Sequence, residues 1–269
     1  VAMSQANSHE VHQHGTNALQ VLRRRENLWI TVALLTITLG AWIYTIYRPN
    51  PMGGMDGGMM TGGGMSDVTL FLLGWSVMMV AMMIPATLPL ILLYRTVSRT
   101  RTTVSSFPWL GMGGLLAGYL AVWAVVGLPV YAYSLLADQM GSWGTALPAA
   151  LLVAGGLYQF TALKRSCHSR CSSPLFFLMQ HYKPGLGGAI RLGILHGIDC
   201  LGCCAGLMVG LVALGMMNLA LMLTAAVIIF AEKTLPSGHR VARPLGMAMV
   251  AGGILLLALS LTTGDHMTM

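Results

Sequence analysis

Long uncharged apolar segments recur along the whole chain, and they limit its fold more than any other feature. Only 9% of the 269 residues are charged, whereas an ordinary soluble domain has about 25%. A run of roughly 20 apolar residues is long enough to cross a bilayer as a helix. The sequence therefore predicts an all-α protein, a polytopic transmembrane helical bundle in a lipid bilayer. Seven spans can be drawn, the sixth of them short, at 28–47, 68–93, 109–136, 146–163, 190–214, 218–231 and 244–261.

The distribution of lysine and arginine predicts the orientation of these spans. Every lysine and arginine except Arg48 flanks the spans on one side, and the positive-inside rule makes that side cytoplasmic. The N-terminus is then cytoplasmic and the C-terminus lies outside a bacterial inner (plasma) membrane. This gives a cytoplasmic tail at 1–27, a single membrane domain at 28–261 and an outer tail at 262–269. Because the topology explains the net charge of +7, that charge does not indicate nucleic-acid binding.

The first outer loop, at 49–66, is rich in glycine and methionine. Glycine disfavours a helix, and exposed thioethers suit Cu(I), a soft ion that accepts methionine where harder ions do not. We therefore expect this loop to capture copper, with Met55, Met59 and Met60 as candidate ligands. The alternative is a flexible linker whose methionines are incidental.

Two cysteines lie four residues apart in the predicted inner loop at 164–189. On a helical turn, Cys167 and Cys171 would point in the same direction. The basic residues around them would favour the thiolate form, which is the form that binds metals. The pair is therefore a candidate site for a soft metal ion, and the alternative is two free cytosolic cysteines without a ligand.

Sulfur, imidazole and carboxylate groups also lie inside two predicted spans. On a helical wheel they share one face of the fifth span, and a methionine stripe lies at similar depth on the second. If these helices pack together, the two sets would face each other; a methionine stripe alone is equally typical of ordinary packing. An ionisable residue within a span is a candidate functional residue, and Asp199 could orient the ring of His196 for a metal. The candidate ligands are Met78, Met79, Met82, Met83, His196, Asp199, Cys200, Cys203 and Cys204.

These segments resemble a bacterial family of predicted metal-binding integral membrane proteins of unknown function that is linked to copper. The resemblance is carried by W-S-V-M-M-V-A-M-M-I-P (75–85), G-L-Y-Q-F-T-A-L-K-R-S-C (156–167), C-S-S-P (171–174), H-G-I-D-C-L-G-C-C (196–204), G-M-M-N (215–218) and E-K (232–233). It implies a role in copper delivery or in the maturation of copper oxidases. The ligands it implies are Met78, Met79, Met82, Met83, Cys167, Cys171, His196, Cys200, Cys203 and Cys204.

These observations favour a non-enzymatic, copper(I)-binding membrane protein for copper delivery or transport, including the maturation of a copper oxidase or monooxygenase. Thioethers and thiolates favour Cu(I) over zinc. The expected partners are the copper ion, the bilayer, and a membrane or periplasmic copper enzyme or chaperone. Two alternatives remain: an accessory subunit of a membrane copper enzyme complex, and a membrane thiol–disulfide oxidoreductase that uses Cys200 and Cys203.

Overall fold

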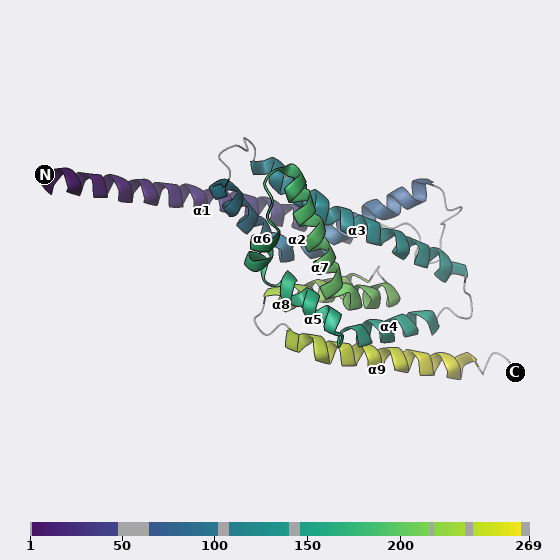
Figure 1. Cartoon of the computed structure of the whole chain (residues 1–269). Helices are drawn as coiled ribbons and strands as arrows, with labels where there is room; N and C mark the ends of the chain where they lie inside the picture. The colour runs from purple at the N-terminus through teal and green to yellow at the C-terminus, as the bar shows by residue number, and fades with distance from the viewer. Residues whose placement is uncertain are drawn as a thin grey trace.

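The fold was determined as a computed structural model, which describes residues 2–47, 65–101, 108–139, 146–215, 218–234 and 239–264. Within these ranges the chain forms nine helices and no strand (Figure 1). The prediction of an all-α helical bundle is therefore confirmed. The helices are α1 (Ala2–Tyr47), α2 (Met65–Arg101), α3 (Pro108–Gln139), α4 (Ala146–Tyr158), α5 (Ala162–Cys171), α6 (Pro174–His181), α7 (Leu186–Ala213), α8 (Leu219–Thr234) and α9 (His239–Gly264).

Several of these helices are long and apolar enough to cross a membrane, which indicates a membrane protein. Five helical segments in the described part of the chain are each long and apolar enough on their own: Arg25–Tyr47, Met65–Arg99, Trp109–Leu136, Leu186–Ala213 and Ala242–Leu259. The predicted fourth span is broken instead, because α4 and α5 meet at an angle of 66° and count as a sixth span only when taken together. The predicted sixth span is α8, whose 16 residues reach roughly 24 Å, less than the roughly 30 Å of the hydrocarbon core.

Glycines set how closely α7 approaches its neighbours. A Cβ placed on Gly193 of α7 would lie 2.0 Å from the carbonyl oxygen of Leu115 on α3. Likewise, a Cβ on Gly206 would lie 2.6 Å from the carbonyl oxygen of Gly155 on α4. Small residues allow such backbone contact between membrane helices. The sequence of α7 thus selects α3 and α4 as its close neighbours.

This packing differs from the hypothesis that the second and fifth predicted spans, α2 and α7, pack directly together. In the described part of the chain α7 packs mainly on α3, α4 and α5, whereas α2 packs mainly on α1 and α3. The indole N–H of Trp75 on α2 donates a hydrogen bond to the carbonyl of Trp123 on α3 at 2.7 Å. Helix α3 therefore contacts both helices extensively, and the glycines of α7 explain why α3 is its preferred neighbour.

The α3–α7 contact makes a prediction about stability. Gly193→Ala would force the two backbones apart, and such overpacking costs roughly 1–3 kcal/mol. Gly187→Ala is the matched control, because a Cβ at that position of α7 meets nothing within 4 Å. Thermal unfolding in detergent should show a lower Tm for Gly193→Ala and an unchanged or slightly higher Tm for Gly187→Ala. Equal Tm values for the two variants would contradict the close contact.

Candidate metal centre

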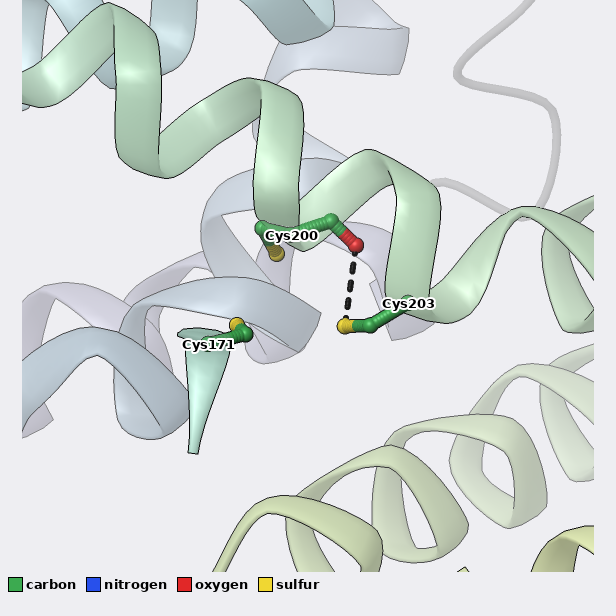
Figure 2. Close-up of side chains that lie close together, drawn as sticks. All are labelled: Cys171, Cys200 and Cys203. Atoms are coloured by element: carbon green, nitrogen blue, oxygen red, sulfur yellow. Dashed lines mark hydrogen bonds between the residues drawn. The ribbon is translucent and has the colours of Figure 1, made fainter. Parts of the chain in front are cut away.

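Three buried thiols converge where the end of α5 meets α7. The Sγ atoms of Cys171, Cys200 and Cys203 all lie within 4.8 Å of one another, and Figure 2 shows the three side chains grouped together. Cys200 and Cys203 are three residues apart on α7, so they share one helix face. Cys171 is the last residue of α5 and approaches α7 because the chain bends between α4 and α5. We call these three residues the thiol trio.

The thiol trio has a size and chemistry that suit one soft metal ion. A metal–thiolate bond of about 2.3 Å places two sulfur ligands at most about 4.6 Å apart, close to the spread of the trio. Cys200 is fully buried, and Cys203 is 2% exposed. A buried, all-sulfur environment favours Cu(I) or zinc over the hard cations.

Two polar side chains from other helices reach the sulfur of Cys200. The hydroxyl of Tyr119 on α3 lies 3.1 Å from this sulfur. The ammonium group of Lys233 on α8 donates a hydrogen bond to it at 2.9 Å. An adjacent ammonium group stabilises a thiolate, the form a metal requires. Sequence reasoning did not identify Tyr119, and it identified Lys233 only as part of the E-K motif, because each is far from Cys200 in the chain.

The other two cysteines are buried nearby but stay outside the trio. Cys204 donates from its Sγ to the carbonyl oxygen of Cys200 at 2.9 Å. Cys167 lies against α7 at Gly202, where an added Cβ would come within 2.5 Å of its sulfur. Of the five predicted cysteine ligands, the structure therefore groups three.

The histidine and aspartate predicted beside these cysteines have separate surroundings. Asp199 forms an ion pair with Arg170 of α5, with 3.3 Å between Oδ1 and Nε. His196 is buried between the rings of Tyr119 and Phe177. Neither ring nitrogen of His196 has a hydrogen-bond partner within the described ranges. The expectation that Asp199 orients His196 is therefore wrong; the carboxylate instead ties α7 to α5.

The predicted methionine ligands fall into two groups. Met78, Met79, Met82 and Met83 are all buried, and they belong to the same hydrophobic cluster as Cys171, Cys200 and Cys203. Their role as ligands stays a prediction. Met55, Met59 and Met60 lie outside the residues that the structure describes.

A buried ion pair holds α5 against α8 beside the trio. The ammonium group of Lys164 lies 3.1 Å and 3.2 Å from the two carboxylate oxygens of Glu232. It also donates a hydrogen bond to the side-chain carbonyl of Gln159. Both charged side chains are only 4% exposed. This pair joins the helix that carries Cys171 to the helix that carries Lys233.

The fold and this centre define a helical membrane protein with a buried thiol site. A comparison with known protein families identifies the family to which it belongs. Residues 72–256 match the family model described as "PpoB2: Copper chaperone". The matched segment covers most of the chain and contains the thiol trio and the buried methionine stripe, so the chain belongs to this copper chaperone family. No curated protein and no solved structure matches it. Membership confirms the expected link to copper and favours a non-catalytic protein.

The Lys164–Glu232 pair allows a direct test of how the site is held. Lys164→Met would leave the Glu232 carboxylate buried without its partner, and breaking such a pair costs roughly 3–5 kcal/mol. The double variant Lys164→Met/Glu232→Met removes both charges and should recover most of the lost stability. Thermal unfolding in detergent measures both effects. A double variant no more stable than Lys164→Met would show that the two charges do not act as a pair.

Proposed function

We propose that this protein binds one Cu(I) ion on Cys171, Cys200 and Cys203 and passes it on within a bacterial inner membrane. The observation that carries the proposal is the convergence of three buried thiols from two helices. Family membership supports a copper-related role. The helices long enough to span a bilayer support a membrane location.

The ligand set supports Cu(I) rather than zinc. Structural zinc sites are almost always four-coordinate, and no fourth histidine, cysteine or carboxylate joins the trio among the described residues. Thiolates select soft ions, and Lys233 offsets part of the negative charge that three thiolates and one monovalent cation would carry. The burial of the trio also protects the ion from water and oxidants.

Two groups of methionines extend this proposal beyond the thiol trio. The outer residues Met55, Met59 and Met60 would collect copper, and the stripe from Met78 to Met83 would offer thioethers within the same buried cluster as the trio. The recipient we propose is a membrane or periplasmic copper enzyme or a further chaperone. A thiol–disulfide oxidoreductase is less favourable, because all five cysteines are free and the family to which the chain belongs is described as copper chaperones.

Copper stoichiometry after anaerobic purification tests the proposal. Cys200→Ser/Cys203→Ser should lose nearly all bound copper, because even the loss of a residue that only orients a metal ligand weakens affinity roughly 10–100-fold. Cys167→Ser is the matched control, since this cysteine is buried on the same helix as Cys171 but lies outside the trio. It should keep the wild-type copper content.

Two results would contradict the proposed site. Copper retained undiminished in Cys200→Ser/Cys203→Ser would place the ion elsewhere, provided that the variant unfolds at the wild-type temperature. Zinc found in place of copper in the wild-type protein would overturn the choice of metal. Equal losses in Cys167→Ser and the double variant would show that the three-residue set is wrong.

A further inference from the structure

A cavity of about 570 Å³ is lined in part by residues that adjoin the thiol trio, although no cysteine of the trio lines it. Its size falls within the range of about 300–1,000 Å³ that small-molecule sites occupy. It is lined by the bend after α4, by α5, by the end of α8 and by the start of α9. These parts of the chain carry the basic residues that the positive-inside rule assigns to the cytoplasm. The charged residues that line the cavity are Lys164, Arg165, Glu232, Lys233 and Arg243.

The lining of this cavity is positively charged. Glu232 is neutralised by Lys164 at 3.1 Å. This leaves Arg165, Lys233 and Arg243 without a carboxylate of their own among the described lining residues. A cleft lined by one sign of charge concentrates ligands of the opposite sign. The expected occupant is therefore an anion.

Two residues connect the cavity to the copper ligands. Lys233 lines the cavity, and its ammonium group lies 2.9 Å from the sulfur of Cys200. Ser172 also lines the cavity and directly follows Cys171 in the chain. A molecule bound in the cavity thus contacts two residues that adjoin the trio: the residue that is hydrogen-bonded to Cys200 and the residue that follows Cys171.

We propose that this cavity binds a small anionic thiol that carries Cu(I), and that copper exchanges there between the carrier and the thiol trio. The proposal rests on the proposed function of the trio. In water, thiolates hold Cu(I) well because both partners are soft. One monovalent cation with two thiolates has a net negative charge even before other groups on the carrier are counted. Such a complex matches both the positive lining and the neighbouring thiols.

The exchange balances without any change of oxidation state. Two bonds between copper and carrier sulfur atoms break and release two carrier thiolates, while three bonds to cysteine sulfur atoms form. Cys200 enters as the thiolate beside the ammonium group of Lys233, and Cys171 and Cys203 each release one proton. These two protons pass to the two departing carrier thiolates, and copper remains Cu(I) throughout. Lys233 stays beside the sulfur of Cys200 and offsets negative charge on whichever thiolate is present.

Binding of a copper-free anion tests the cavity separately from the metal site. The probe is S-methylglutathione, which has a net negative charge and no free thiol, titrated into the metal-free protein by calorimetry. Wild type should bind it, and Arg165→Gln/Arg243→Gln should bind at least about tenfold more weakly because the lining loses both of its arginine charges. Lys183→Gln/Arg191→Gln is the control, with the same charge removed outside the cavity. It should bind as wild type does.

Copper transfer from two carriers of opposite charge tests the exchange step. Cu(I) is supplied anaerobically either as its glutathione complex, which is anionic, or as its cysteamine complex, which is cationic with the same thiolate ligation. Arg165→Gln/Arg243→Gln should slow loading from the glutathione complex roughly tenfold and leave loading from the cysteamine complex unchanged or faster. The difference should shrink as salt is added.

The outcomes separate this proposal from the proposed function. If wild type does not bind S-methylglutathione, or if Arg165→Gln/Arg243→Gln binds it equally well, the anion site is wrong whatever the trio does. If the variant slows loading from both carriers equally, the cavity does not select anionic carriers and the proposal is overturned. If S-methylglutathione binds as expected but neither carrier loads the wild-type trio, the copper site fails and the exchange fails with it, while the anion site stands.

Discussion

The contact between α5 and α7 brings the thiol of Cys171 to those of Cys200 and Cys203, and the rest of the site depends on it. Two interactions hold it in place: Arg170 pairs with Asp199 at 3.3 Å, and the sulfur of Cys167 packs against Gly202. The end of α4, just before the bend, is fixed to the same point of α7, because the hydroxyl of Tyr158 donates to the carbonyl of Gly202 at 2.6 Å. The absence of a side chain on Gly202 is what lets α5 lie so close to α7.

The two carboxylates near the trio each form an ion pair with a basic side chain other than Lys233. Lys164 neutralises Glu232, and Arg170 pairs with Asp199. Lys233 instead directs its ammonium group to the sulfur of Cys200. Inside a membrane protein an ionisable side chain is costly and is expected to have a functional partner. A thiolate, bare or bound to copper, is such a partner, and this arrangement explains why two adjacent residues, Glu232 and Lys233, face different neighbours.

The sequence was sufficient to predict the fold class and the shared helix face of two of the three thiols. Long apolar segments predict helices because a single helix satisfies its own backbone in lipid and needs about 20 apolar residues to cross it. Spacing along one helix predicts that Cys200 and Cys203 share a face. Contacts between helices were not predictable in the same way. The convergence of Cys171 requires the 66° bend between α4 and α5, and the position of Lys233 depends on where α8 ends. The preference of α7 for α3 over α2 follows from glycine contacts.

The central claim is that sulfur atoms of Cys171, Cys200 and Cys203 together hold one Cu(I) ion. X-ray absorption at the copper edge of the anaerobically loaded protein tests it most directly. The account predicts a Cu(I) edge and three sulfur neighbours at about 2.3 Å, near the length of other metal–thiolate bonds. A spectrum dominated by nitrogen or oxygen neighbours, or one unchanged in Cys171→Ser, would contradict it.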